Sequence, residues 1–250
     1  MKPLKFYFDK AVDSYEKIGI LQKKIALELL RKIETGKYSC IVEIGSGKGF
    51  LSIPLNEILS FEKYIHVDIS LEFLKKLKTN LKGKHLFINA CAEDIPLKEN
   101  LADLIVSCSA LHWIKEPEKS FIKIFDILKK GGQFYFSIFT SNSLKELKMI
   151  SEISGFGSVF SLKKAEFYIE LIKSLGFSFD YELKVYQEIY NSPKDLLIFH
   201  KLTGTNYTES KKFSGKNSFK KFCETYKKLF SNHHGVYATY EVLFIRGKIE

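Results

Sequence analysis

The sequence predicts a doubly wound α/β domain with a mostly parallel, seven-stranded sheet. Short apolar runs alternate with stretches of helical periodicity between residues 39 and 139, and a glycine-rich turn follows the first run. Strands that alternate with helices form parallel sheets with helices on both faces. Two later apolar runs, at 185–190 and 237–245, have no helix-and-strand repeat between them. We therefore expect them to form an antiparallel edge of the sheet.

Each expected element follows from its apolar spacing and from the residues that bound it. We expect strands at 39–43, 64–68, 85–89, 101–107, 133–139, 185–190 and 237–245. We expect helices at 14–33, 49–60, 71–81, 117–129, 143–153, 161–174, 193–203 and 216–230. Ser70 should cap the helix at 71–81, and Gly131-Gly132 should end the helix at 117–129. The polar stretch 205–218 is expected to be a mobile loop.

Length and composition indicate one ordinary globular domain. The chain has 250 residues, of which 45% are hydrophobic and 27% charged, and such a chain can bury a real core. No apolar run approaches the roughly 20 residues that span a bilayer, and residues 1–6 do not resemble a signal peptide. The scattered cysteines indicate reduced thiols, a cytoplasmic protein and no metal site. They are Cys40, Cys91, Cys108 and Cys223.

The net charge of +10 is the unusual bulk property, and only Arg31 and Arg246 among the basic residues are arginines. A solvated lysine surface is the simplest explanation. An acidic partner, either a nucleic acid or a protein, is the functional alternative. Proteins that recognise bases depend heavily on arginine, so the composition favours a protein partner over a nucleic acid.

The segment Val42–Gly49 carries the strongest local signal, with glycines at positions 45, 47 and 49. It lies between an expected strand and an expected helix, where glycine allows the main chain to approach a ligand. The dinucleotide motif G-x-G-x-x-G would need glycine where Phe50 stands, and Lys48 is not followed by the Ser or Thr of a phosphate-binding P-loop. The alternative is that these glycines form only a tight turn and bind no ligand.

The G-x-G-x-G pattern, with Glu43 two residues before Gly45, resembles the first motif of class I methyltransferases. The resemblance implies the cofactor S-adenosyl-L-methionine, with the main chain of the loop against it and Glu43 near its cationic methionine end. Asp68 closes the next strand, where its carboxylate could accept both ribose hydroxyls. Cys91 stands where these enzymes usually place an acid for adenine. Ala92 or Glu93 could take over that contact.

The chain also resembles the malonyl-[acyl-carrier protein] O-methyltransferases of biotin synthesis, nearly from end to end. The opening segment 8–15, followed by Gln22, is similar to the start of that family, where the matching Tyr and Gln lie over the cofactor. Ser107-Cys108-Ser109-Ala110-Leu111-His112-Trp113 is similar to its S-N-L-A-L-Q-W pattern. Later matches lie at 143–147, 201–206 and 239–244, and a basic residue that often precedes the match at 201–206 is absent here, where Ile198 and Phe199 stand.

The resemblance implies transfer of a methyl group from S-adenosylmethionine to the free carboxylate of malonyl-acyl-carrier protein. A carboxylic acid with a pKa near 4 is already ionised at neutral pH, so no general base is expected. We expect acceptor positioning by Tyr15, His112 and Trp113, although His112 is equally consistent with a structural histidine. The cofactor contacts are expected from Tyr15, Gln22, Glu43, Gly45, Ser46, Gly47, Gly49, Asp68, Ile69, Cys91, Ala92, Glu93, Ser107 and Ser109.

The same resemblance divides the expected single domain. Residues 34–140 would form the cofactor-binding core, 1–33 and 141–235 a helical cap with acceptor-side elements, and 236–250 the final strand. The carrier protein is acidic, so a lysine rim could steer it. The candidates are Lys145, Lys148, Lys163, Lys164 and Lys194. We expect neither nucleic-acid nor membrane binding, and the sequence leaves the oligomeric state open.

Two other functions remain compatible with the motifs, and a third is weakened by them. The chain could methylate another acceptor, such as a small carboxylic acid, a quinone or tRNA. It could also be a regulator that binds S-adenosylmethionine without catalysis, because such a protein would need the same two cofactor-binding motifs. A nicotinamide-dependent dehydrogenase is disfavoured by Phe50.

Overall fold

A twisted sheet with the strand order β3-β2-β1-β4-β5-β8-β6 forms the centre of the molecule, and the short β7 pairs with β8. The computed structural model describes residues 2–208 and 215–249. The strands are β1 Lys37–Ile44, β2 Ser60–Asp68, β3 His85–Asn89, β4 Ala102–Cys108, β5 Leu128–Phe139, β6 Ser178–Tyr190, β7 Ser231–Asn232 and β8 Gly235–Lys248. The α-helices are α1 Lys2–Ala11, α2 Tyr15–Ile18, α3 Ile20–Leu30, α4 Ser52–Ile58, α5 Leu71–Asn80, α6 Pro117–Asp126, α7 Lys145–Ser154, α8 Ala165–Ser174, α9 Pro193–Leu202 and α10 Lys216–Leu229. A short 3-10 helix, η1, spans Leu111–Trp113.

The sheet confirms the predicted mostly parallel architecture. β1 pairs in parallel with β2 and β4, and β3 and β5 extend the parallel set on either side. β8 is antiparallel to both β5 and β6, so the reversed strand lies one place in from the edge. The chain winds outward from β1 to β3 and then crosses back to β4. The loops after β1 and β4 therefore meet at the carboxyl edge of the sheet, where open α/β folds bind ligands.

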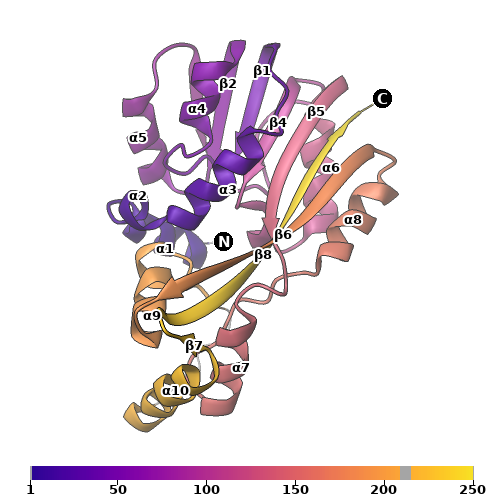
Figure 1. Ribbon diagram of the computed structural model, residues 1–250. Coiled ribbons are helices and arrows are strands. Elements are labelled where there is room, and N and C mark those ends of the chain that lie inside the picture. Colours follow the sequence, from indigo (N-terminus) through magenta and orange to yellow (C-terminus); the bar gives the residue numbers. More distant parts are fainter. Residues whose placement is uncertain (1, 209–214, 250) are drawn as a thin grey trace.

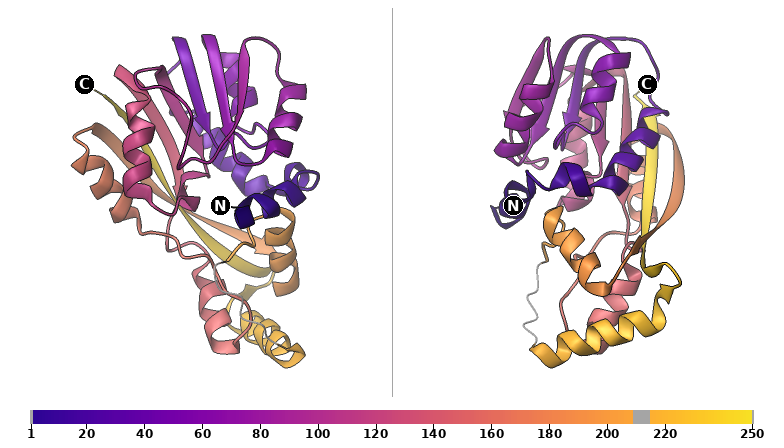
Figure 2. Two further views of the ribbon diagram at one scale, coloured as in Figure 1. Left: turned by 180° about the vertical axis from the view of Figure 1, so that it is seen from behind. Right: turned by 60° about the vertical axis from the view of Figure 1, so that its left-hand side comes forward.

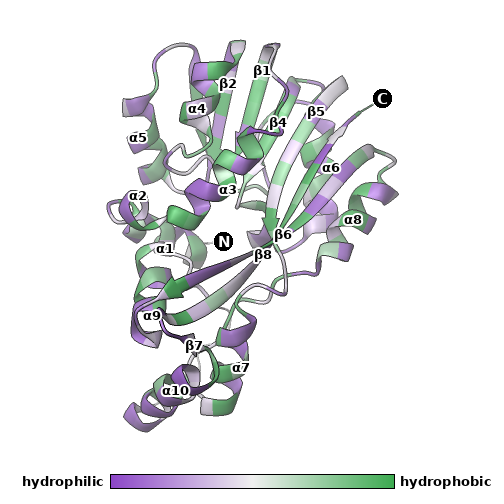
Figure 3. Ribbon diagram, in the orientation of Figure 1, coloured by the Kyte–Doolittle hydropathy of each residue, from purple (hydrophilic) through white to green (hydrophobic). Residues whose placement is uncertain are grey.

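Alternation along the strands builds a hydrophobic core on each face of the sheet. Ile41 of β1 lies in one core together with Ile25 of α3, whereas Val42 lies in the other together with Phe121 of α6. Successive side chains of a strand point to opposite faces, and because both faces of the sheet are covered, the last five residues of the central strand β1 are all buried. In Figure 3, β1 and β4 are coloured mainly as hydrophobic, whereas α10 is mainly hydrophilic.

The C-terminal half adds a helical region below the carboxyl edge of the sheet. β6 and β8 are long and continue past the other strands, and α7, α9 and α10 gather around their lower part (Figures 1 and 2). Buried aromatic residues join this region to the core, among them Phe222 and Tyr226 of α10. Within residues 2–208 and 215–249, no helix combines the length and the apolar character needed to cross a bilayer.

Several local predictions were wrong in their boundaries; β6, for example, begins at Ser178 and not at residue 185. The expected helix 14–33 breaks at Gly19, whose N–H donates to the carbonyl of Tyr15 over 2.8 Å. Gly131 and Gly132 do not end α6 but lie inside β5, next to a register shift between β4 and β5. The helix α1 was not predicted. The expected loop 205–218 falls partly outside the described residues, and its last three positions belong to α10.

Candidate active site

The glycine loop after β1 is a tight turn that only glycine fits well. Gly45, Gly47 and Gly49 have φ values of 75°, 52° and 92°, a region that other residues rarely adopt. A Cβ atom on Gly45 would lie 2.2 Å from Cβ of Ala110, and one on Gly49 would lie 2.5 Å from Leu77. A Cβ on Gly47 would meet nothing within 4 Å, because Gly47 faces a cavity. Gly45 and Gly49 are thus packed against neighbouring side chains, whereas Gly47 is open to the cavity.

Asp68 at the end of β2 is joined directly to this loop. Its Oδ2 accepts from the N–H of Gly47 over 2.7 Å, and its Oδ1 accepts from the N–H of Ser70 over 2.8 Å. Burial raises the pKa of Asp68 to about 6, against the lowering effect of these two N–H groups. Each carboxylate oxygen can accept a second hydrogen bond. Asp68 lines the same cavity as Gly45, Gly47 and Ile69, so its remaining acceptor capacity is available to a ligand there.

Glu43 is buried below the loop, with 1% of its surface exposed. Its Oε2 accepts from Ser52 over 2.6 Å and from Tyr64 over 2.7 Å. The residue also lines a small cavity beside Ser46 and Gly47. Its carboxylate therefore lies between an internal hydrogen-bond network and the space in front of the glycine loop.

The N-terminal segment covers this space. The ring of Tyr15 stacks on Phe50 with centroids 5.6 Å apart, and Lys48 of the loop donates to Glu16 of α2 over 3.2 Å. Burial, with smaller contributions from the charges of Cys108 and Asp68, raises the pKa of the Tyr15 phenol, so its proton is retained. Phe50, which stands where the dinucleotide motif has its third glycine, thus supports the ring of Tyr15.

Gln22 of α3 provides a second group from the N-terminal segment. Its side chain is buried, and its Oε1 has no hydrogen-bond partner among the described residues. It lines both the small cavity of Glu43 and the large pocket described below. A buried amide oxygen without a partner is costly, so this atom is suited to accept from a ligand such as an amino group.

Ser107 and Ser109 at the end of β4 differ in their surroundings. The Ser107 hydroxyl donates to the carbonyl of Ile44 over 2.8 Å, which ties β4 to β1 and leaves its side chain outside the cavities. Ser109 has a left-handed φ of 55°, and its N–H donates to Ser137. It lines all three cavities around the glycine loop, as Tyr15 does.

The structure places only one of the three residues expected near adenine at the cavity. Ala92 lines it together with Ala90. The Cys91 thiol instead donates to Glu93 over 3.5 Å, and Glu93 accepts from the backbone N–H of Lys115 over 2.7 Å. Glu93 therefore fixes the segment after β3 to the segment after η1.

A larger pocket of about 390 Å³ opens beyond Tyr15 and Ser109. His112 and Trp113 of η1 form its near wall, and both are more than nine-tenths buried. Burial lowers the pKa of His112 to about 3, so the imidazole is neutral at physiological pH. Its Nδ1 has no hydrogen-bond partner in the described part of the chain. A buried, neutral and unsatisfied imidazole can serve a ligand as donor or acceptor.

The far wall of this pocket was not predicted from sequence. It includes His200 of α9 and Tyr240 of β8. The Tyr240 hydroxyl lies 3.2 Å from His200 Nε2, and Thr205 Oγ1 lies 2.7 Å from His200 Nδ1. Both nitrogens of His200 are thus satisfied, in contrast to His112. The resemblance at 201–206 and 239–244 pointed to these segments, but no local pattern showed that they face the pocket.

Known proteins that are similar to this chain are methyltransferases, which agrees with a cofactor site at the glycine loop. A family model described as a methyltransferase domain matches residues 42–136. A methyltransferase structure from Bacillus halodurans superposes with a TM-score of 0.65 at 13% identity, covering 90% of this chain and 98% of that one. A possible histamine N-methyltransferase from Thermotoga maritima gives a TM-score of 0.60 at 19% identity, covering 99% of this chain and 100% of that one. At such identities these structures establish the fold.

The fold is that of class I methyltransferases, and together with the methyltransferase domain matched at residues 42–136 the site identifies an S-adenosylmethionine-dependent methyltransferase. The finer resemblance is also confirmed. Malonyl-[acyl-carrier protein] O-methyltransferase of Calditerrivibrio nitroreducens is 27% identical over 240 residues, covering 95% of this chain and 92% of that protein. The protein of that name from Bacteroides thetaiotaomicron is 28% identical over 255 residues, covering 96% and 95%.

The residues present fit the cofactor of this class. Gly47 lines two cavities, one together with Asp68 and the other together with Gln22, whose Oε1 has no partner among the described residues. S-adenosylmethionine carries a ribose and a charged amino group, which need acceptors of this kind. It is the methyl donor of this enzyme, and when bound it supplies an electrophilic methyl group.

Proposed function

We propose that this enzyme methylates the free carboxylate of malonyl-acyl-carrier protein, giving the malonyl methyl ester that starts pimeloyl synthesis for biotin. The relatives that match along the whole chain carry the name of this activity. The observation that supports it most directly is the junction at Tyr15 and Ser109, where the cavity of the glycine loop meets the larger pocket. A methyl donor in the first space would face an acceptor in the second.

In this proposal, the glycine loop and Asp68 hold the nucleoside, while Glu43 and Gln22 accept from the amino group of the methionine end. Ala92 lies against the adenine. Ser107, Cys91 and Glu93 act by holding the surrounding strands and loops, since their hydrogen bonds are internal to the protein.

The residues of the larger pocket orient the acceptor and exclude water. The carboxylate needs no base, because it is ionised at neutral pH. Positioning the carboxylate oxygen about 3–3.5 Å from the methyl group is worth roughly 7–11 kcal/mol of the barrier. The Tyr15 hydroxyl and the neutral His112 imidazole provide hydrogen bonds to the acceptor, and Trp113 provides an apolar wall. The burial of these side chains keeps the nucleophile poorly hydrated.

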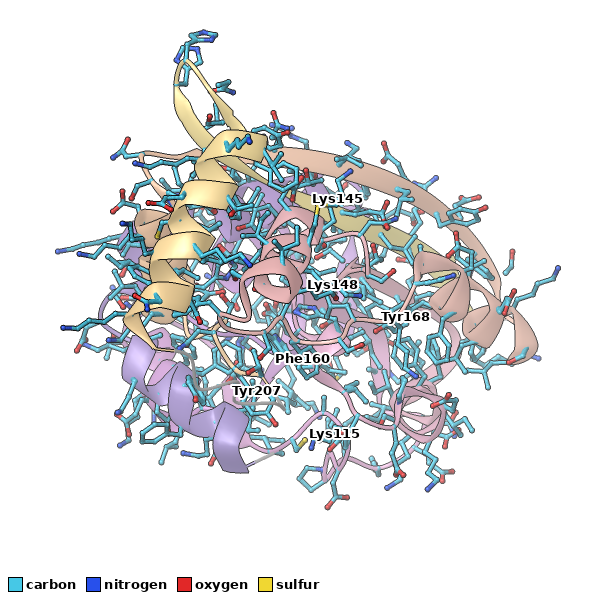
Figure 4. All side chains as sticks on the ribbon, turned by 90° about the horizontal axis from the view of Figure 1, so that it is seen from below. Lys115, Lys145, Lys148, Phe160, Tyr168 and Tyr207 are labelled. Carbon is cyan, nitrogen blue, oxygen red and sulfur yellow. The ribbon has the colours of Figure 1, made fainter. Side chains whose placement is uncertain are left out.

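Exposed lysines lie next to the larger pocket on the side of the C-terminal helices. Lys145 and Lys148 of α7 flank the pocket residues Leu144 and Leu147, and Lys163 and Lys164 follow the pocket residue Leu162. Figure 4 shows Lys145 and Lys148 on the face that also carries Phe160 and Tyr207, two rings that lie 5.9 Å apart. An acidic carrier protein would be steered to this face. Lys194 of α9 is also exposed.

The test is incubation of the enzyme with labelled S-adenosylmethionine and malonyl-carrier protein, followed by mass spectrometry of the carrier. We expect one methyl group per malonyl group. Free malonyl thioesters, small dicarboxylic acids and RNA are tested in parallel, and methylation of one of them in place of the carrier would identify a different acceptor. Binding of S-adenosylhomocysteine without turnover of any acceptor would instead favour a non-catalytic regulator.

We also propose the division of the domain into a cofactor-binding core at 34–140, acceptor-side elements at 1–33 and 141–235, and a final strand at 236–250. The match to the methyltransferase-domain family lies inside the first range. The larger pocket is lined by residues of every range, for example Tyr15, His112, His200 and Tyr240.

A further inference from the structure

The strand β6 at the border of the sheet leaves one of its two backbone edges without a partner. Among the described strands, β6 pairs only with β8 (Figure 1). This pairing is continuous from Ser178 to Tyr190, and no other backbone hydrogen bond within the described residues involves positions 179–189. The N–H and C=O groups of alternate residues in a strand point to opposite edges. A row of donors and acceptors is therefore open along β6.

One face of this strand is also apolar and exposed. Tyr181, Leu183 and Val185 have 57%, 44% and 64% of their surface exposed. Successive side chains alternate between the two faces of a strand, so these three residues share one face. On the other face, Lys184 donates to Glu28 of α3 over 2.8 Å. The exposed apolar row therefore lies on the face that α3 does not cover.

β6 lacks the features that usually protect an edge strand. Natural proteins keep such strands short, interrupt them with proline or a β-bulge, or place charges on them. β6 has 13 residues without a proline, and its register with β8 shows no shift. Only charge remains as a protection, and it depends on what the charged residues would face. They are Asp180, Glu182, Lys184 and Glu188.

The order of these charges suits a second copy of the same strand. When two identical strands pair in antiparallel fashion about a two-fold axis at Leu183, residue 182 of one lies opposite residue 184 of the other. Glu182 then faces Lys184 on both sides of the axis. Tyr181 faces Val185 in the same way, and Leu183 faces its own copy. Pairs of opposite charge and apolar pairs at directly opposed positions stabilise a sheet, whereas like charges destabilise it.

The neighbouring registers are less favourable. Residues that oppose each other in an antiparallel pair have the same backbone orientation, so the axis lies at a residue and not between two. Axes at residues 181, 182, 184 and 185 each bring like charges together; about residue 185, for example, Glu182 faces Glu188. An axis at residue 186 avoids like charges but sets Val185 against the polar Gln187. The axis at residue 183 therefore gives the best match.

A second copy fits this edge better than an acidic carrier protein does. Asp180, Glu182 and Glu188 outnumber Lys184 on β6, so the strand would repel an acidic partner. None of the residues of β6, all of which the structure describes, lines the larger pocket or the cavities at the glycine loop. Pairing along β6 therefore leaves both active sites open.

We propose that the enzyme is a homodimer in which β6 pairs with β6 of a second copy, antiparallel and centred on Leu183, so that the two sheets become one. The contact buries the exposed apolar row and gives partners to the open backbone groups of both strands. Glu182 and Lys184 set the register, because the adjacent registers place like charges opposite each other. The dimer does not depend on which acceptor the enzyme methylates.

Analytical ultracentrifugation of the purified full chain over about a hundredfold range of concentration tests the dimer. We expect a dimer in the wild type whose fraction rises with concentration. Leu183→Lys, which places two lysines opposite each other at the axis, should be monomeric over the same range, with S-adenosylhomocysteine binding unchanged. Ile122→Lys, at a position of α6 that is 48% exposed, is the matched control and should dimerise as the wild type does.

Two charge variants test the register. Glu182→Lys and Lys184→Glu should each be monomeric, because each sets like charges against each other across the axis at residue 183. An equal mixture of the two variants should form a dimer, since every lysine of one then faces a glutamate of the other.

Any of three results overturns the proposal. The wild type stays monomeric at every concentration, which would leave the β6 edge to a different protein. Leu183→Lys dimerises as the wild type does, which would place the interface elsewhere. The mixture of the two charge variants stays monomeric, which would exclude the register.

If the charged variants do not fold, oxidation of Leu183→Cys replaces them. We expect a disulfide-linked dimer, because the two copies of this residue meet at the axis within the distance that a disulfide spans. The wild type, with its own four cysteines, and Ile122→Cys give the background. No disulfide-linked dimer above that background contradicts the proposal.

Discussion

The backbone N–H of Gly47 donates to the carboxylate of Asp68 over 2.7 Å. The glycine loop and the acid that ends β2 are therefore one unit, although 21 residues separate them. The side chain of Asp68 both shapes the loop and offers acceptors to the ligand. We expect Asp68→Ala to weaken S-adenosylhomocysteine binding by more than about 1 kcal/mol, as loss of a charged acceptor does. Calorimetry measures this, and an unchanged dissociation constant contradicts the role of Asp68.

The raised pKa of Asp68 makes the ligand-free protein sensitive to pH. Burial raises this pKa from 3.8 to about 6, so the folded chain binds the proton more readily than the unfolded chain. The ionised carboxyl therefore costs folding free energy above about pH 6, and this cost disappears as the pH falls towards 4. We expect the wild type to gain stability relative to Asp68→Asn between about pH 7 and 5, while ligand affinity falls. Denaturant titrations across this range test the sign, and a parallel response of the two proteins refutes it.

Gly47 and Gly45 should respond differently to substitution. A side chain at Gly47 meets open space but enters the cavity, whereas one at Gly45 collides with Ala110. Gly47→Leu should abolish S-adenosylhomocysteine binding at a folding cost of only about 1–2 kcal/mol for the left-handed backbone. Gly45→Leu should destabilise the fold itself. Gly155→Leu, at a similar φ and with nothing nearby, controls for backbone strain. If Gly47→Leu retains its affinity for S-adenosylhomocysteine, the glycine loop does not lie against the ligand.

Tyr15 should affect turnover more than folding. Its ring stacks on Phe50 and its hydroxyl has no role in that contact, so Tyr15→Phe keeps the packing and removes the hydrogen bond. We expect kcat for malonyl-carrier protein to fall while the melting temperature changes little, because the lost interaction is with the acceptor. Tyr181→Phe, on the exposed face of β6, is the matched control. Full activity in Tyr15→Phe excludes the hydroxyl from the site.

Lysines of α7 should govern recognition of the carrier. Lys145→Glu combined with Lys148→Glu should raise KM for malonyl-carrier protein and weaken the dependence of KM on salt, with kcat unchanged. Steady-state kinetics at two ionic strengths measure the effect. Lys37→Glu makes the matched control, since it begins β1 at the opposite end of the sheet. Equal KM values in the three proteins place the carrier elsewhere.

Local sequence patterns determined the parallel core of this protein and the location of its cofactor site. Strands β1 to β5, the Ser70 cap and the loop Gly45–Gly49 all follow from interactions between neighbours in the chain. Turn geometry, capping and strand burial depend on residues a few positions apart, so the sequence carries them directly. The expected boundary at Gly131-Gly132 was wrong because these residues lie inside β5, which pairs with the distant strand β4.

Only the tertiary structure decided the acceptor side and the state of the buried acids. His200 and Tyr240 meet across 40 residues, and Glu43, His66 and His85 meet across three neighbouring strands. These contacts depend on strand order and register, which no local pattern encodes. The burial that packs these side chains also raises the pKa of Asp68 and lowers that of His112. It leaves the Gln22 Oε1 without a hydrogen-bond partner among the described residues.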